Sequence, residues 1–151
     1  MKDIKPPKTI YDRTKQLIIR NKLLTLFKSI FDSDERIKQI RIYGSALKLS
    51  LGVYSYKYMP NAPTARDRSD IDTVILFKGL TGNKIRLKNG ILLEKWRFIK
   101  DGNNNIIYIE GHPVMCAPLT TPEDFRIKRF IPWAFGGYNY TLNSKVLFKR
   151  K

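Results

Sequence analysis

The chain has 151 residues, of which 42% are hydrophobic, and this size and composition predict one domain with its own core. Its 29 lysines and arginines against 13 acids give a formal net charge of +16, which favours a polyanionic partner such as nucleic acid. The aromatic content of 12% argues against a disordered basic tail, and one cysteine with one histidine excludes an internal disulfide and argues against a usual zinc site.

The single cysteine and the apolar pattern also bear on location. No segment approaches the roughly 18 apolar residues that cross a bilayer, and the N-terminus lacks the apolar stretch of a signal peptide. We therefore expect a soluble, cytoplasmic protein in a reducing compartment, with no membrane partner.

The first half of the chain predicts a helix and a strand before a long loop. Residues 1–10 are rich in lysine and proline and predict a flexible basic arm. Apolar residues recur at helical spacing over 11–31, starting with Leu17, with basic residues largely between them, which predicts an amphipathic helix. IKQIRIYGS, 37–45, reads as a strand that enters a Gly-Ser turn. A short helix over 46–51 and an exposed loop reaching residue 69 should follow.

The second half predicts further strands. IDTVILF, 71–77, has the β-branched content of a buried strand, and Asn89-Gly90 between two apolar runs predicts a hairpin. Turns are expected at 101–105 and at Gly111-His112-Pro113, the second between the strands IIYIE and VMCAP.

The last part of the chain predicts a helix start at 120–125 and then a basic, aromatic segment over 126–151. The order of elements favours an α+β fold, with a single domain over 11–151.

Asp70 and Asp72 carry the strongest chemical signal. At positions i and i+2 of a strand, their side chains should share one face, roughly 6–7 Å apart. Carboxylates this close repel unless water screens them or a cation lies between them, and Mg²⁺ or Mn²⁺ takes oxygen ligands of this kind. Taken alone, the pair more often marks a solvated turn or a helix cap. Gly44-Ser45 changes this balance, because a glycine turn and a hydroxyl can hold a phosphate.

The pattern of strand, Gly-Ser, intervening segment and Ser-Asp-Ile-Asp resembles the nucleotidyltransferase domain of the DNA polymerase beta superfamily. The resemblance implies a small mixed β-sheet backed by helices over roughly residues 15–120. It also implies that Asp70 and Asp72 ligate the metal and that Gly44, Ser45 and Ser69 bind the nucleoside triphosphate.

Two features depart from that pattern. The 24 residues between Ser45 and Asp70 are about twice the number usual in the family, so residues 53–66 look like an insertion. The family also carries a third carboxylate on a neighbouring strand, where this chain has Met115. A thioether can neither bind Mg²⁺ well nor accept the proton. Glu110 is the candidate substitute that we assign to the catalytic set, and Glu94 is a second candidate.

The remaining chemically active side chains favour ordinary roles. We expect His112 to be a solvated turn residue and Cys116 to be a core residue rather than a nucleophile. Trp96 and Trp133 are more often core or surface-covering aromatics than base-stacking groups. In the insertion, three alternating tyrosines lie near basic residues that we assign to nucleic-acid binding: Lys57, Arg66 and Arg68.

Two functions are consistent with these observations. The first is a metal-dependent nucleotidyltransferase that transfers a nucleoside monophosphate from a nucleoside triphosphate to a nucleic-acid or protein acceptor. The second is a catalytically impaired, nucleotidyltransferase-like component of a larger assembly, which binds nucleic acid and a protein partner. The intact Gly-Ser and Asp-x-Asp motifs favour the first function, and Met115 favours the second.

Overall fold

The computed structural model describes residues 7–58, 66–79, 84–94, 97–119 and 144–150, and they form a mixed α+β fold rich in sheet. The main sheet has the strand order β11-β2-β5-β10-β8, with β9 paired to β10. Its strands are β2 (Ile37–Tyr43), β5 (Ile71–Phe77), β8 (Arg97–Phe98), β9 (Tyr108–Ile109), β10 (His112–Leu119) and β11 (Ser144–Lys149). The central pair, β5 and β10, is parallel, whereas the other pairs are antiparallel. The buried strand expected over 71–77 is confirmed as β5.

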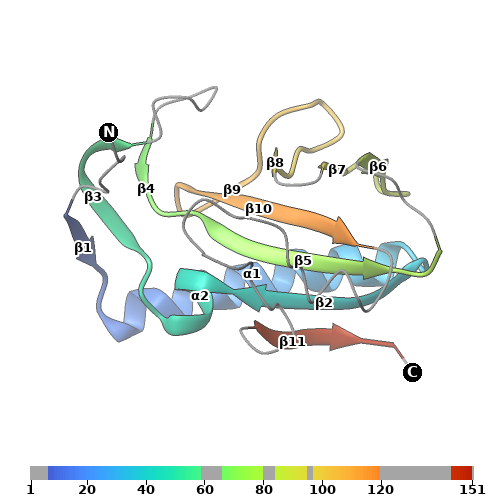
Figure 1. The fold of residues 1–151 in the computed structure, drawn as a ribbon, viewed down its shortest axis with the longest axis horizontal. Helices are drawn as coiled ribbons and strands as arrows, with labels where there is room; N and C mark the ends of the chain where they lie inside the picture. Colours follow the sequence, from blue (N-terminus) through green and yellow to red (C-terminus); the bar gives the residue numbers. More distant parts are fainter. Residues whose placement is uncertain (1–6, 59–65, 80–83, 95–96, 120–143, 151) are drawn as a thin grey trace, which may run out of the picture.

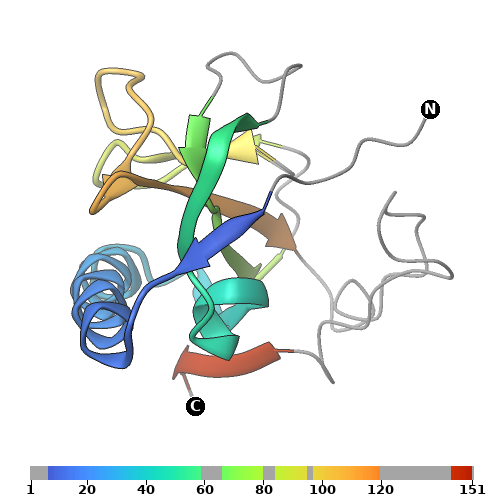
Figure 2. The ribbon, with the colours of Figure 1, turned by 90° about the vertical axis from the view of Figure 1, so that its left-hand side faces the viewer.

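The helix α1 (Arg13–Ser33) lies along one face of this sheet, as Figures 1 and 2 show from two sides. The Asp12 side chain accepts a hydrogen bond from the Lys15 backbone N–H and caps the first turn. Ile19, Leu23 and Phe27 are fully buried against the sheet. Each such side chain contributes about 1.5–3 kcal/mol through burial, so the helix and the sheet stabilise each other.

The predicted helix over 11–31 is confirmed as α1, and two of its expected apolar positions, Phe27 and Phe31, are buried. Leu17 is 37% exposed, however, and the buried positions also include Gln16 and Ile30. The apolar residues of this helix surround much of its circumference, so their spacing alone does not decide which side meets the sheet.

Three strands of a second sheet correct two further expectations. β1 (Lys8–Ile10), β3 (Gly52–Tyr58) and β4 (Arg66–Arg68) form a second sheet in the order β1-β3-β4, at one end of the main sheet (Figure 1). Residues 8–10 are therefore not a loose arm, and the segment after the short helix is not simply an exposed loop. A Cβ on Gly52 would overlap the backbone of Thr9, so glycine permits the close approach of β1 and β3.

The short helix α2 (Gly44–Lys48) begins two residues earlier than expected and follows β2 without a loop. Two polar side chains of α1 hold its far end. The Arg20 guanidinium donates to the carbonyls of Ala46 and Leu47, at 2.5 and 2.9 Å. The buried amide of Gln16 donates to the Leu51 carbonyl at 2.8 Å and accepts from its N–H at 3.0 Å. The Gly-Ser turn is thereby anchored to the helix under the sheet.

Both turns of the hairpin region are confirmed. β6 (Lys84–Arg86) pairs with β7 (Leu92–Glu94) across the turn that contains Asn89-Gly90. Residues 101–105 turn through hydrogen bonds from the N–H groups of Asn103 and Asn105 to the Asp101 carboxylate. The third expected turn lies at Glu110-Gly111, and His112 and Pro113 already belong to β10.

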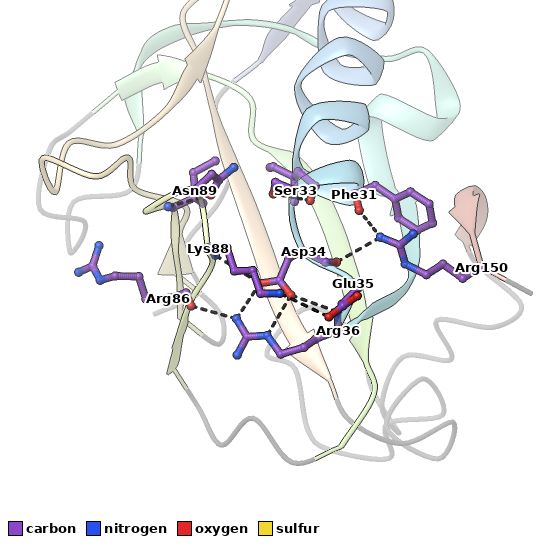
Figure 3. A network of polar contacts seen from close by, with 11 residues as sticks. Phe31, Ser33, Asp34, Glu35, Arg36, Arg86, Lys88, Asn89 and Arg150 are labelled. Carbon is purple, nitrogen blue, oxygen red and sulfur yellow. Dashed lines mark hydrogen bonds and ion pairs between the residues drawn. The ribbon is translucent and has the colours of Figure 1, made fainter.

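A polar network holds the strand β11 against the end of α1 (Figure 3). The buried Asp34 carboxylate accepts from the Arg36 guanidinium at 2.6 and 2.9 Å, and these bonds lower the pKa of Asp34. Arg150 donates to the carbonyls of Ile37 and Asp34, at 2.7 and 3.2 Å, and to that of Phe31. Arg150, which directly follows β11, therefore binds the carbonyl groups at the end of α1.

Part of the expected organisation cannot be compared with this fold. The helix start at 120–125, Trp96 and Trp133 lie outside the described residues, as does most of the segment 126–151. In the part of the chain that the structure describes, we find no helix with the length and apolarity needed to span a membrane.

Candidate nucleotide site

Gly44 and Asp72 lie in direct contact where β2 ends. Tyr43, the last residue of β2, is the register partner of Asp72 on β5, so the chain leaves the sheet beside that carboxylate. Gly44 has φ +65°, and a Cβ placed on it would lie 2.7 Å from Oδ2 of Asp72. A side chain at position 44 would therefore meet both backbone strain and the carboxylate. The two motifs singled out in the sequence meet at one place.

Asp70 and Asp72 are both half-buried, at the start of β5. Ile71 and Ile75 of this strand pack into the core beneath α1, so alternation turns Asp72 to the opposite face of the sheet. Asp70 lies one residue before the strand and two residues before Asp72, so the same alternation places its side chain on the face of Asp72. Half-exposed carboxylates at i and i+2 fit a Mg²⁺ or Mn²⁺ ion that takes its other ligands from water and phosphate.

The described residues contain no group of three or more histidine, cysteine or acidic side chains able to hold a metal ion. The candidate site therefore offers two carboxylates from this part of the chain. Mg²⁺ in nucleotide sites is often bound by one or two carboxylates and substrate phosphates, so this donor set suits a metal that arrives with a nucleotide.

Ser45 follows Gly44 and is half-buried in the first turn of α2. Its Oγ accepts a hydrogen bond from the Lys8 ammonium at 3.4 Å. Lys8 comes from β1, and its ammonium also lies over the Tyr54 ring, 5.8 Å from the centroid. The Gly-Ser turn thus has a carboxylate on one side and a cation on the other.

Met115 occupies the neighbouring position across the sheet from Asp72. The two residues are register partners in the parallel pair of β5 and β10, and Met115 is also the partner of Phe98 on β8. The row that crosses the sheet here is Ser144, Tyr43, Asp72, Met115 and Phe98. Asp72 is its only acidic member, so no carboxylate comes from the adjacent strand at this level.

Glu110 does not join the two aspartates in the structure. Its carboxylate accepts from the ammonium groups of Lys15 and Lys22, at 3.0 and 2.9 Å, and both lysines belong to α1. These hydrogen bonds lower the pKa of Glu110 to about 2. Its carboxylate is directed to the helix that covers the face opposite Asp72. We therefore replace the catalytic role assigned to Glu110 with an ion-pairing role between the β9-β10 turn and α1. Glu94 lies in the separate β6-β7 hairpin.

Ser69 is 2% exposed, and its hydroxyl contacts the backbone of Gly52 rather than the Gly-Ser turn. The Ser69 Oγ accepts from the Gly52 N–H at 3.0 Å and lies 3.3 Å from the Gly52 carbonyl, to which it donates. In place of the expected nucleotide contact, Ser69 joins the small sheet to the start of β5, one residue before Asp70.

His112 is fully buried, which corrects the expectation of a solvated turn histidine. Its Nδ1 lies 2.7 Å from the Ser69 carbonyl and its Nε2 lies 2.9 Å from the Tyr11 hydroxyl. Because a carbonyl only accepts, Nδ1 carries the proton and Nε2 accepts from the hydroxyl. Burial lowers the pKa of His112, which favours this neutral form. His112 thus connects the start of α1 to the strand that carries the aspartates.

The proposed nucleic-acid contacts are only partly described. Arg68 donates to the Glu110 carbonyl at 3.2 Å and borders Gly111, so it holds the β9-β10 turn. The side chains of Lys57 and Arg66 lie outside the described residues. Cys116 is fully buried, which confirms its place in the core, and burial raises the pKa of its thiol to about 12.

Sequence reasoning missed Lys8 and Gln16. Lys8 lies in a segment whose lysines and prolines indicate an arm, and only pairing with β3 brings it to Ser45. Gln16 could have been noticed as a polar residue on the buried side of a helix, where an amide needs hydrogen-bond partners.

Comparisons of this chain with protein-family models, with curated proteins and with solved structures found no match.

Proposed function

We propose that this chain is a metal-dependent nucleotidyltransferase, with the nucleotidyltransferase fold that its motifs resemble. The observation that carries the proposal is the contact between Gly44 and the Asp72 carboxylate, since a Cβ at position 44 would lie 2.7 Å from Oδ2. A phosphate-holding turn and a metal-binding carboxylate are useful together only if one ligand carries both a phosphate and a metal. A nucleoside triphosphate with Mg²⁺ is such a ligand.

In this proposal, each residue has a distinct task. Asp70 and Asp72 hold the metal, and the Gly44 backbone and the Ser45 hydroxyl hold the triphosphate against it. Bound Mg²⁺ would neutralise charge on the phosphates. The acceptor hydroxyl oxygen forms a bond to the α-phosphorus while the bond from that phosphorus to the bridging oxygen breaks. Pyrophosphate leaves with that oxygen, and the hydroxyl proton passes to solvent water.

The acceptor proposed here is a nucleic acid or a protein. The formal net charge of +16 supports a polyanionic acceptor, because lysines and arginines that contact phosphates release counterions on binding. Such binding should weaken steeply as the salt concentration rises.

A transfer assay tests this function. The full chain is incubated with each labelled nucleoside triphosphate, with Mg²⁺ or Mn²⁺, and with RNA, DNA or protein as acceptor. We expect label on one acceptor class with the native chain and loss of label with Asp70→Asn and with Asp72→Asn. Asp32→Asn, which removes an exposed acid of α1, is the matched control and should keep full transfer. Equal labelling by all four proteins would contradict the proposal.

One observation favours the second function, a binding module with an impaired site. Met115, rather than an acid, is the register partner of Asp72, so the adjacent strand supplies no group at that position to accept a proton. In this case, RNA or DNA binding should survive in Asp70→Asn and Asp72→Asn, with no label transferred by the native chain.

A further inference from the structure

We propose that one cationic surface of this protein binds the phosphate backbone of a nucleic acid. The surface, which we call the hairpin surface, consists of Arg36, Lys78, Arg86 and Lys88. These residues lie just before β2, just after β5 and in the β6-β7 hairpin. The inference rests on the proposed function in one respect only, that the nucleic acid bound here would be the acceptor. Binding itself needs neither metal nor nucleotide.

The buried Asp34 carboxylate organises the hairpin surface (Figure 3). Besides the Arg36 guanidinium, this carboxylate accepts a hydrogen bond from the Lys88 backbone N–H at 3.3 Å. The Arg36 guanidinium donates in turn to the Arg86 carbonyl at 3.2 Å, and the Arg36 carbonyl accepts from the Lys78 N–H at 2.7 Å. These contacts bring four basic residues together from three segments that are distant in sequence.

Arg86 and Lys78 carry charges that no acid compensates within the part of the chain that the structure describes. Both side chains are exposed, and the Arg86 guanidinium donates to the neutral Gly90 carbonyl at 2.8 Å. Figure 3 shows this guanidinium directed away from the Asp34 network. An arginine and a lysine are therefore presented to solvent without an acidic partner.

The other two cations of the surface are paired, but one of these pairs is weak. Lys88 Nζ lies 3.5 Å from the carboxylate of Glu35, whose side chain is 85% exposed. An exposed pair of this kind adds little stability, so a phosphate can replace the acid beside Lys88. Arg36, by contrast, is bound to the buried Asp34, which fixes its guanidinium. The hairpin surface thus has three cations that phosphates can contact.

The composition of the hairpin surface favours a nucleic acid over a membrane. Among the described residues, the large apolar side chains that are exposed lie elsewhere: Ile10, Leu17, Ile18 and Tyr108. The described surface therefore offers no apolar group to enter a bilayer. A guanidinium can bind a phosphate through two parallel hydrogen bonds, and separate cations fit the successive phosphates of a nucleic-acid backbone.

The hairpin surface lies well away from the proposed metal site. Asp72 is near the start of β5 and Lys78 directly follows its end, so at about 3.3 Å per strand residue their backbones are roughly 20 Å apart. A nucleic acid held here leaves room at Asp72 for metal and nucleotide. Its binding can therefore be measured in the absence of both.

Fluorescence anisotropy with labelled single-stranded RNA and DNA tests this inference over a range of salt concentrations. The full chain is used without metal or nucleoside triphosphate. In Lys78→Gln/Arg86→Gln, the plot of log affinity against log salt concentration should become less steep by about 0.7 for each lost phosphate contact. At 0.1 M salt, the two lost contacts should weaken binding about 10- to 30-fold. Glu35→Gln should tighten binding, because it releases the Lys88 ammonium from its acid.

Arg13→Gln/Lys48→Gln is the matched control. It also removes one exposed arginine and one exposed lysine, the first residue of α1 and the last residue of α2, at the opposite end of the main sheet (Figure 1). Its affinity should stay within about threefold of the native value, since salt screens charges at a distance. Urea titrations check that all the variants are folded.

Three outcomes would overturn the hairpin surface: no binding of RNA or DNA by the native chain, equal loss of affinity in the two double variants, or binding to phosphatidylserine vesicles in place of RNA and DNA. The transfer assay decides the proposed function separately. If Lys78→Gln/Arg86→Gln binds like the native chain while the native chain transfers label, the surface is overturned and the proposed function stands. If that variant loses binding but the native chain transfers no label, the surface stands and the transferase function is overturned.

Discussion

Met115 on β10 is the parallel register partner of Asp72 on β5, so the neighbour of this carboxylate on the adjacent strand is a thioether. Met115 is half-buried, and its other register partner is Phe98. The proposed metal site therefore has Asp72 on β5, Asp70 one residue before that strand, and an apolar neighbour on β10. The residue beside Asp72 distinguishes the two proposed functions, because an acid at that position could accept a proton and Met115 cannot.

Met115→Asp should therefore increase affinity for divalent metal. In the absence of metal, the new carboxylate lies beside Asp72, and repulsion should lower the free energy of unfolding by about 1–3 kcal/mol. Mg²⁺ should reverse this loss, because a cation between the two acids stabilises the folded state. Urea titrations with and without Mg²⁺ measure both effects. Met115→Asn, which adds polarity without charge, is the control and should show no rescue by Mg²⁺.

Gly44→Ala should disrupt the site more than it destabilises the fold. The added Cβ would lie 2.7 Å from Asp72 Oδ2, and a flexible carboxylate can rotate away at small cost. The positive φ of position 44 adds about 1–2 kcal/mol of strain. Gly79→Ala is a close control, because Gly79 has φ +87° but no atom within 4 Å of the added Cβ.

The two alanine variants should thus lose similar free energies of unfolding in urea, whereas only Gly44→Ala should lose Mg²⁺-dependent nucleotide binding. Equal nucleotide binding by both variants would contradict the contact between the turn and the carboxylate.

The lowered pKa of His112 predicts that the free energy of unfolding decreases in mild acid. Its pKa in the folded state is lowered from the usual 6.5, chiefly by burial, so the unfolded chain binds more protons just below that pH. The free energy of unfolding should therefore fall as the pH decreases below about 6.5, by at most about 1.4 kcal/mol per pH unit. His112→Asn keeps an N–H donor near the Ser69 carbonyl and does not titrate. Its unfolding free energy should be less dependent on pH over this range, as urea titrations between pH 5 and 7.5 would measure.

The lowered pKa of Glu110 predicts a second decrease in the free energy of unfolding, at lower pH. Lys22 and Lys15 lower its pKa from the usual 4.5 to about 2, so the paired carboxylate stabilises the folded state above about pH 4.5. This contribution should decrease as the pH falls from about 4.5 toward 2. Glu110→Gln removes the charge, so its difference in unfolding free energy from the native chain should shrink across the same range. A difference independent of pH would show that the two lysines do not stabilise the carboxylate.

The central elements were predictable from local sequence. Apart from Asp72, the residues of β5 are β-branched or apolar, and this composition predicts the limits of the strand. Asn89-Gly90 determines a hairpin through its own backbone preferences. The closeness of the Gly44 turn to Asp72 could also be inferred, because consecutive strands of a sheet are commonly neighbours.

The elements and contacts that the sequence did not predict depend on partners distant in sequence. β3 is stabilised by pairing with β1, more than 40 residues earlier, so neither segment alone indicates a strand. His112 follows a turn glycine, and only the Ser69 carbonyl and Tyr11 hydroxyl explain its burial. Glu110 is drawn to lysines of α1, which a strand pattern cannot reveal.

The most direct test is calorimetric titration of the full chain with a nucleoside triphosphate, with and without Mg²⁺. We predict Mg²⁺-dependent binding by the native chain and by Gly79→Ala, and its loss with Asp72→Asn and with Gly44→Ala. Binding that is the same for all four proteins would show that metal and phosphates do not meet at Asp72 and the Gly44 turn, and would contradict the proposed site.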